Sequence, residues 1–236
     1  MPPLLYPFPP LLGGTLVKRY KRFFADIELD SGELVVAHCP NTGPMTGICI
    51  PGNRVMVSTS DDPKRKLRFT WELIDIDGTW VGVNTGLPNR VVRQLLEQHL
   101  LPELGDYTEV RSEVKYGSDG KSRIDFLLEG GDRPVYVEVK NTTWTDGPLA
   151  LFPDTVTTRG QKHLREMTDL LPTARAATIY FINRDDCDRF APGDSKDPEY
   201  GQLLRAGVAA GLEVYPCRFR TTPEGLTYLG LATLEL

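Results

Sequence analysis

The sequence predicts an α+β protein of two domains, with an all-β unit ahead of a unit that mixes helices and strands. Residues 1–82 contain five strand-like runs separated by turn residues, and no helical pattern strong enough to cover a sheet. From residue 89 onward, helical and strand-like patterns follow one another in an irregular order. The boundary is predicted at the segment NTGLPN, which gives domains of residues 1–83 and 84–236.

The composition is that of a globular protein. Of the 236 residues, 40% are hydrophobic and 25% are charged. No stretch approaches the roughly 18 apolar residues that span a bilayer, so no membrane partner is expected. The N-terminal run MPPLLYPFPPLL is apolar, but five prolines in its first ten residues exclude the helix of a signal peptide. We expect an extended arm that lies against the body of the protein.

The cysteines give no sign of a disulfide framework. All four are widely spaced and form no CxxC pair, which favours a reduced, cytoplasmic protein with structural thiols. His38, Cys39 and Cys49 are the nearest approach to a zinc site. Their spacing matches no common zinc pattern and no fourth ligand is evident, so zinc is not expected.

The strand-like runs of the first domain fit a small closed barrel. They are residues 18–29, 33–39, 53–60, 67–77 and 79–84. Turn residues such as those of LDSGE, PNTGPMTG and IDGTW connect them. Five short antiparallel strands without a covering helix favour a barrel of the oligonucleotide/oligosaccharide-binding (OB) type.

Two basic clusters stand out in the first domain. Residues 1–82 hold 9 basic and 9 acidic side chains, and eight of the basic ones fall within KRYKRFF (18–24) and KRKLRF (64–69). Each cluster mixes cations with aromatic rings, which suits phosphate contact and base stacking; a solvated strand face is the alternative. The candidate nucleic-acid-binding residues are Lys18, Arg19, Lys21, Arg22, Lys64, Arg65, Lys66 and Arg68.

The second domain has the order helix, three strands, helix, strand. The predicted elements are a helix at 89–101, strands at 108–116, 122–130 and 134–141, a helix capped by Thr157 or Thr158 and closed by Pro172, a strand at 176–184, a helix at 197–211, and two strands, EVYPCRF and GLTYLG. This order is not a regular alternation of strands and helices.

Two of these strands carry a pattern with chemical meaning. A glycine-rich turn joins SRIDFLLEG to PVYVEVKN, so the two strands should pair as a hairpin in which Asp125 and Glu138 face each other. Two carboxylates about 5 Å apart repel by roughly 3 kcal/mol at an effective dielectric near 20. A cation relieves this repulsion, and hard oxygen ligands suit Mg²⁺ or Mn²⁺. Lys140, on the same strand face as Glu138, is placed to orient an attacking water or to stabilise developing charge.

The spacing SRID, twelve residues, then EVK resembles the PD-(D/E)xK nuclease superfamily. The resemblance implies a restriction-endonuclease-like α/β core in which Asp125, Glu138 and Lys140 are the catalytic acids and lysine. The implied metal ligands are Asp125, Glu138 and Val139. Ile124 departs from the proline of the motif. Gln161, on the following helix, stands where many exonuclease-like members carry a glutamine.

Over nearly the whole chain the resemblance narrows to one family. The segments KRYKRFFADIEL, AHCPNTGPM, EVKYG, SRIDF, YVEVKN and DPEYG occur in an order that is similar to the SfsA (sugar fermentation stimulation protein) family. This resemblance implies an OB-like domain on a nuclease-like domain, DNA as the partner, and a link to sugar-utilisation genes.

Further charged residues of the second domain allow either a functional or a purely structural interpretation. Glu113 is a candidate third acid, with Glu97 as its rival; a surface ion pair is the other reading of Glu113. A cluster at the start of the helix after the EVK strand fits phosphate binding or a solvated face. Its candidate nucleic-acid-binding residues are Arg159, Lys162 and His163.

Three functions remain open from the sequence. The favoured one is a DNA-binding, Mg²⁺-dependent phosphodiesterase. The second is a regulator of sugar-utilisation genes that grips DNA with a catalytically idle nuclease fold, although no helix-turn-helix or zinc-finger pattern is present. The third is a small-molecule or phosphosugar enzyme, for which no nucleotide-cradling glycine loop is found.

Overall fold

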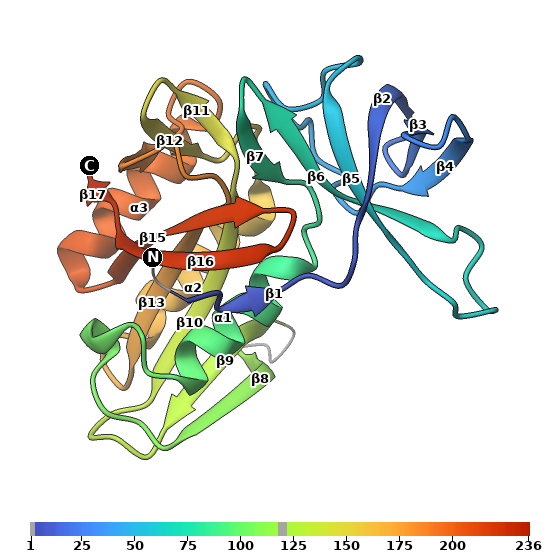
Figure 1. Ribbon diagram of the computed structural model, residues 1–236. Coiled ribbons are helices and arrows are strands. Elements are labelled where there is room, and N and C mark those ends of the chain that lie inside the picture. The colour runs from blue at the N-terminus through green and yellow to red at the C-terminus, as the bar shows by residue number, and fades with distance from the viewer. Residues whose placement is uncertain (1–2, 118–121) are drawn as a thin grey trace.

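A computed structural model describes residues 3–117 and 122–236, and these form a β-barrel beside a larger α/β unit (Figure 1). The barrel strands are β2 (Leu12–Tyr20), β3 (Phe24–Leu29), β4 (Leu34–His38), β5 (Arg54–Thr59) and β6 (Phe69–Ile76). They run in the order β4-β3-β2-β5-β6, and parallel pairing of Ala37 with Phe69 and His38 with Thr70 closes the ring. This is the connectivity of an OB fold, so the predicted five-stranded barrel is confirmed.

Alternation of side chains explains why these strands close on themselves. On β3, Ala25, Ile27 and Leu29 are buried, while Asp26 and Glu28 lie on the outer face. The inner residues pack around Trp71, which is fully buried and donates its indole N–H to the carbonyl oxygen of Leu73. The barrel therefore has a core of its own.

The predicted strand boundaries in the barrel are wrong in two places. The run 18–29 is not one strand: β2 and β3 pair as a hairpin with Tyr20 opposite Phe24, and residues 21–23 turn between them. Lys21 and Arg22 make this turn with φ of 49° and 64°, so the turn has none of the glycine or asparagine that would mark it in the sequence. The run TWVGVN contains β7 (Thr79–Gly82), which pairs only with β6 and lies outside the closed ring.

The second domain is built around a seven-stranded sheet of order β1-β16-β15-β13-β10-β9-β8. Its helices and strands are β1 (Tyr6–Pro7), α1 (Leu87–Glu97), a 3₁₀ turn (Pro102–Leu104), β8 (Glu109–Tyr116), β9 (Ser122–Glu129), β10 (Val135–Thr142), α2 (Thr158–Leu170), β13 (Arg175–Ile182), α3 (Pro198–Ala210), β15 (Glu213–Thr222) and β16 (Gly225–Leu231). A small sheet beside it contains β11 (Trp144–Asp146), β12 (Leu149–Phe152), β14 (Arg189–Pro192) and β17 (Thr233–Leu234). The predicted order helix, three strands, helix, strand is confirmed for the large sheet, but β11 and β12 of the small sheet, which were not predicted, lie between its third strand and the second helix.

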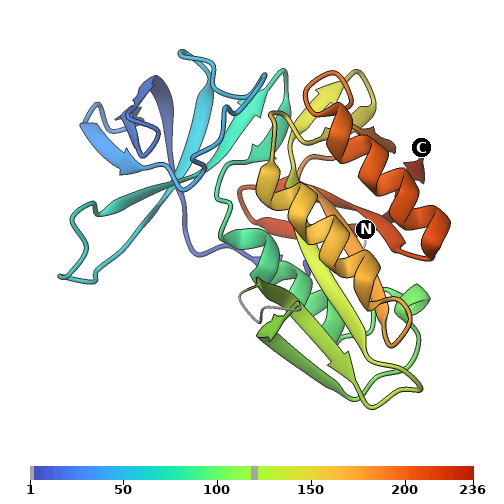
Figure 2. The same ribbon diagram turned by 180° about the vertical axis from the view of Figure 1, so that it is seen from behind.

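Helices cover both faces of the large sheet (Figures 1 and 2). Val135, Val137 and Val139 of β10 pack into the core under α1. Tyr136, on the other face of β10, packs against the core under α2 and α3. Thr157 accepts a hydrogen bond from the N–H of Gly160 and so caps α2, which decides between the two predicted caps.

The N-terminal arm lies on the second domain. Tyr6 and Pro7 pair with Leu226 and Gly225 of β16, and Leu5 is buried in the core under α1. The expectation of an extended arm against the body of the protein is confirmed. No helix among residues 3–117 and 122–236 combines the length and the apolar character that crossing a membrane requires.

Short contacts join the barrel to the second domain. The N–H of Gly82 on β7 donates to the carbonyl oxygen of Asn183 at 3.0 Å, and a Cβ on Gly82 would lie 2.0 Å from the Asn183 side chain. The Thr85 hydroxyl donates to the Pro40 carbonyl oxygen at 3.0 Å. The first contact joins β7 to the residue that follows β13, and the second joins the barrel loop 38–47 to the segment before α1.

Candidate active site

The site forms where β9 parts from β10. The two strands pair in the register Val135–Leu128 to Val137–Phe126, and the same register continues to place Asp125 opposite Glu138. At that point the N–H of Val139 donates to Oδ2 of Asp125 at 2.7 Å, so a carboxylate continues the pairing in place of a main-chain carbonyl. The predicted hairpin is therefore confirmed, and it brings the two acids to neighbouring strands.

Glu138 is buried and held by two basic side chains. Its Oε1 accepts from Nζ of Lys140 at 2.6 Å and lies 2.5 Å from Nδ1 of His163. Its other oxygen, Oε2, is buried and has no hydrogen-bond partner among the described residues. Burial raises the pKa of Glu138, but Lys140 and His163 outweigh burial, so the pKa falls below its ordinary value. Glu138 is thus held as a carboxylate with one oxygen unpaired.

Asp125 is in the opposite electrostatic situation. Burial first, and then the charge of Glu138, raise its pKa to about 6, although hydrogen bonds from Val139 N–H and Asn89 oppose the shift. The Asn89 amide, on the first turn of α1, donates to Oδ1 of Asp125 at 2.7 Å. The ionised form of Asp125 is therefore costly in the protein without a nearby cation.

The chemistry of these residues fits a hard divalent cation. The two carboxylates supply oxygen ligands, and the unpaired, buried Oε2 of Glu138 still needs a partner. Val139 has an apolar side chain, so only its main-chain carbonyl oxygen could serve as a ligand. No group of three or more His, Cys, Asp or Glu side chains is arranged to hold a metal within the described part of the chain. A cation here would depend on two carboxylates, which Mg²⁺ accepts because it usually keeps several waters.

The other candidate acids lie on the surface. Glu113 is exposed, has φ of 57° and lies 3.6 Å from Arg123, which is the ion pair that the sequence left open. The register of β8 with β9, in which Ser112 faces Phe126, still places Glu113 across from Asp125. Glu97 forms an ion pair with Arg93. It lies two helical turns after Asn89, the α1 residue that contacts Asp125, so it is remote from the carboxylate pair.

Gln161 does not reach the carboxylate pair. Its amide nitrogen donates to both oxygens of Asp197 at 2.9 and 3.1 Å. Asp197 in turn caps α3 by accepting from the N–H of Tyr200 and also accepts from the N–H of Thr157. Gln161 therefore joins the starts of α2 and α3.

The predicted phosphate cluster on α2 divides into two parts. Arg159 and Lys162 are exposed, and Lys162 lies 3.4 Å from Glu166. His163 is 4% exposed and belongs to the Glu138 cluster, where its ring also meets the edge of Tyr116. Its burial removes it from any surface contact with a phosphate, which corrects its assignment to that cluster.

Of the candidate basic residues of the barrel, Lys18 and Arg19 lie at the end of β2, and the others lie on the β2–β3 and β5–β6 loops. Lys21, Arg22, Lys64, Lys66 and Arg68 are exposed. Lys18 lies 3.3 Å from Asp26, and Arg65 donates to the Thr70 hydroxyl at 2.8 Å. Arg19 donates to the carbonyl oxygens of Asn41 and Gly43, so its guanidinium also braces the loop 38–47.

The β2–β3 and β5–β6 loops meet at an open depression. It is lined by Phe23, Phe24, His38, Arg65, Lys66 and Leu67. Phe23 is 48% exposed, which is unusual for a phenylalanine. Residues from both basic clusters therefore share one surface with exposed rings.

The sequence reading missed two contacts of the site. Asn89 is a polar residue on the first turn of an otherwise apolar helix face, which is the only signal that it points at a polar group. His163 lies on the face of α2 that carries the buried Leu164 and Met167, and that burial indicates a core partner rather than solvent.

A closed OB barrel on an α/β core that carries Asp125, Glu138 and Lys140 on neighbouring strands defines a restriction-endonuclease-like protein with an OB domain. Family models agree with both parts. Residues 17–83 match the SfsA N-terminal OB domain, and residues 86–225 match the sugar fermentation stimulation protein RE domain. The chain belongs to the SfsA family.

Full-length relatives support the same assignment. The chain is 70% identical over 239 residues to a sugar fermentation stimulation protein homolog of Synechococcus elongatus, and the match covers 100% of both proteins. A homolog of that name from a Cyanothece species is 67% identical and covers 98% of each. The solved structure of Pyrococcus furiosus SfsA in complex with Ca²⁺ matches with a TM-score of 0.90 at 24% identity, covering 99% of this chain and 100% of that one. At that identity the likeness shows the fold.

Proposed function

We propose that this protein binds DNA through its barrel and hydrolyses phosphodiester bonds at Asp125, Glu138 and Lys140 with Mg²⁺ or Mn²⁺. The observation that carries the proposal is that Asp125 is costly to ionise beside Glu138 when no cation is bound. A partly buried aspartate whose pKa is raised to about 6 beside a buried glutamate makes the empty site unfavourable at neutral pH. Arrangements of this kind are typical of functional sites, where a ligand or a reaction makes use of the charge.

Each residue has a distinct task in this proposal. Asp125, Glu138 and the carbonyl of Val139 would hold the cation, and His163 would fix Glu138 through Oε1. A bound Mg²⁺ or Mn²⁺ supplies a more acidic water and neutralises charge on the phosphate. Lys140, with Nζ 2.6 Å from Glu138, would orient the water or stabilise negative charge on the phosphate oxygens.

A solved relative supports the choice of cation. Pyrococcus furiosus SfsA has been determined in complex with Ca²⁺. Ca²⁺ and Mg²⁺ share a preference for oxygen ligands, although Ca²⁺ takes more of them. A divalent cation at oxygen ligands is therefore consistent with the family to which this chain belongs.

The barrel supports DNA as the substrate. The β2–β3 and β5–β6 loops follow the first and fourth barrel strands, and these are the loops with which OB domains bind oligonucleotides. The second basic cluster falls on the β5–β6 loop, and the first spans the end of β2 and the β2–β3 loop. The exposed ring of Phe23 lies beside Arg65 and Lys66, which combines a stacking surface with phosphate-binding cations.

The second candidate is a DNA-binding regulator that does not cut. The name shared by the relatives favours it, because stimulation of sugar fermentation describes an effect on metabolism and not a reaction. In that case the Glu138–Lys140–His163 cluster would stabilise the fold and contribute to DNA binding, without a catalytic role.

Cleavage assays separate the two candidates. Single-stranded, duplex and flap DNA are incubated with the purified protein in Mg²⁺, Mn²⁺ or EDTA, and binding is measured on the same preparations. We expect metal-dependent cleavage that Asp125→Asn abolishes and Glu129→Gln preserves, because Glu129 is a surface acid of the same strand paired with Arg111. Tight binding without cleavage of any DNA form in either metal would overturn the enzyme and favour the regulator.

A further inference from the structure

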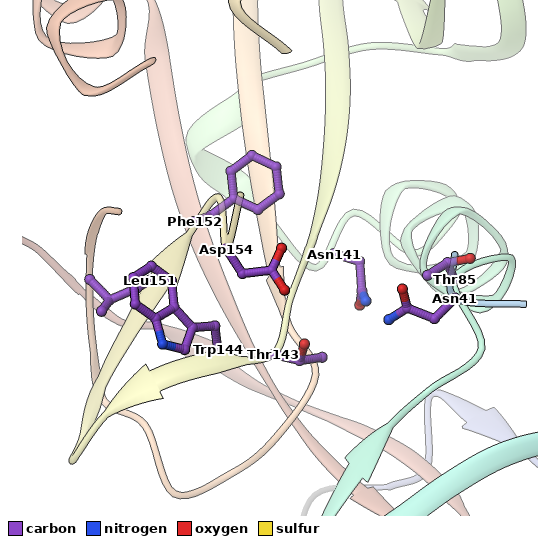
Figure 3. Close-up of a pocket in the computed structure, with 8 residues that line it drawn as sticks. All are labelled: Asn41, Thr85, Asn141, Thr143, Trp144, Leu151, Phe152 and Asp154. Atoms are coloured by element: carbon purple, nitrogen blue, oxygen red, sulfur yellow. The ribbon is translucent and has the colours of Figure 1, made fainter. Parts of the chain in front are cut away.

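A second polar site lies at the junction of the two domains (Figure 3). This junction pocket has a volume of about 90 Å³ and is open to solvent on one side. That volume is below the roughly 300–1,000 Å³ of pockets for whole small molecules, so the pocket suits one small flat group of a larger ligand. The side chains that the argument uses are Asn41, Asn141, Thr143, Trp144, Phe152 and Asp154.

The pocket offers hydrogen-bond donors and an acceptor to one ligand. Oδ1 of Asn41 accepts from the N–H of Gly43, and Oδ1 of Asn141 accepts from Asn183, so both amide groups present their N–H₂ ends to other partners. Asp154 receives only a long contact, 3.4 Å, from the N–H of Thr46 among the described residues. Figure 3 shows the side chains of Asn41, Asn141 and Asp154 directed toward the same space.

The apolar wall of the pocket is rigid. Trp144 lies against Gly193, where a Cβ would come within 2.7 Å of its ring, and Lys196 lies over the ring at 5.8 Å. Phe152 packs against the rings of Tyr180 and Tyr200. A fixed aromatic wall with polar groups at one edge suits a flat heteroaromatic ring.

A cationic depression adjoins the pocket. Arg19 and Arg22 line it together with Gly43 and Thr155. Gly43 is two residues from Asn41, and Thr155 follows Asp154, so the same two loops form both depressions. A carboxylate repels phosphate whereas two arginines attract it, so the two depressions suit the base and the phosphate of one nucleotide.

We infer that the junction pocket takes one nucleobase of the bound DNA strand, turned out of its stack, with a neighbouring phosphate on Arg19 and Arg22. Asp154 accepts a hydrogen bond from an exocyclic amine, as acidic side chains do from the N4 amine of cytosine. The pocket therefore prefers cytosine to thymine, which presents a carbonyl oxygen at that edge. This inference rests on the proposed DNA binding and adds a base preference to it.

The test compares fluorescence anisotropy of short single-stranded oligo-dC and oligo-dT with the full-length protein in EDTA at pH 7.5. We expect wild-type protein to bind oligo-dC about tenfold more tightly, since a good base contact gives roughly 1–3 kcal/mol of discrimination. Asp154→Ala and Asn141→Ala should reduce this ratio severalfold. Asp146→Ala should retain it, because Asp146 is an exposed acid on β11 outside the pocket.

Two failures are distinguishable. Equal binding of oligo-dC and oligo-dT by the wild type, or an unchanged ratio in Asp154→Ala, overturns the base pocket and leaves DNA binding intact. A variant that weakens both oligomers equally also overturns it, because that result reports a structural role for the loop. The absence of binding to any oligomer overturns the proposed function itself. Melting temperatures of both pocket variants verify that they are folded.

Discussion

Replacing the two site acids by amides should change the pH dependence of the stability of the metal-free protein in opposite directions. Asp125 and Glu138 face each other on neighbouring strands, but the pKa of Asp125 is raised to about 6 and that of Glu138 is lowered. We expect Asp125→Asn to gain stability relative to wild type as the pH rises, and Glu138→Gln to lose it. Removing one negative charge at Asp125 and removing one at Glu138 thus have opposite effects on stability as the pH rises.

The magnitude for Asp125 follows from linkage between proton binding and folding. Its ordinary pKa is 3.8, so between pH about 4 and about 6 the folded protein binds a proton that the unfolded chain has released. Wild-type stability therefore falls through this window, by up to about 3 kcal/mol for the whole shift, and is level above it. Asp125→Asn lacks this loss. It also loses one hydrogen bond, worth roughly 1–3 kcal/mol, because an amide nitrogen replaces one of two accepting oxygens.

The contribution of Glu138 to stability changes with pH in the opposite direction to that of Asp125. Because its folded-state pKa is lowered, its stabilisation is present above the ordinary value of 4.5 and is lost as the pH falls through the lowered pKa. Glu138→Gln removes that stabilisation and leaves the cation of Lys140, largely buried, without its partner. The deficit of this variant should therefore be largest at neutral pH and should shrink in acid.

Urea denaturation in EDTA, followed by circular dichroism at half-unit steps from about pH 2.5 to 8, measures both effects. The lost hydrogen bond in Asp125→Asn is an offset independent of pH, so the change in its relative stability between pH 4 and 6.5 isolates the electrostatic effect. A flat difference across that window, or a rise in stability of Glu138→Gln at neutral pH, would refute the electrostatic description of the site.

Three further outcomes are expected. Mn²⁺ or Mg²⁺ should raise the melting temperature of wild type but not of the double variant Asp125→Asn/Glu138→Gln, and an undiminished rise in that variant would move the cation elsewhere. Lys140→Ala should slow cleavage by two orders of magnitude or more, about 3 kcal/mol of transition-state stabilisation, with DNA affinity lowered only slightly; equal losses in rate and affinity would contradict its catalytic role. Arg22→Ala and Lys66→Ala should each flatten the plot of log affinity against log salt by about 0.9 on duplex DNA, and an unchanged slope would place the phosphate contacts outside the barrel loops.

The hairpin of β9 and β10 was predictable because its signals are local. A glycine-rich turn fixes the pairing, and the period of two along each strand then fixes which side chains face each other. Asp125, Glu138 and Lys140 follow directly from that register. The barrel was predictable for the same reason, since its strands alternate buried and exposed residues over short distances.

Contacts between distant segments were not predictable in this way. Gln161 and Asp197 are 36 residues apart, and His163 is 25 residues from Glu138; nothing in either local sequence specifies the partner. The turn of the β2–β3 hairpin was not predicted for a different reason. Lys21 and Arg22 adopt a left-handed conformation that their residue types rarely choose, so the surrounding strands impose the turn.

The arm that pairs with β16 makes the order of synthesis matter for this protein. Tyr6 leaves the ribosome long before its partner Leu226, and the whole barrel lies between them in the chain. The barrel, with a core of its own, can fold during translation, whereas the sheet gains its edge strand β1 only after β16 has been synthesised. Before the arm pairs with β16, Leu5 and Phe8 are exposed apolar residues on an unpaired segment. A foreign segment inserted directly before Tyr6 would therefore disturb the second domain, although it is attached ahead of the first.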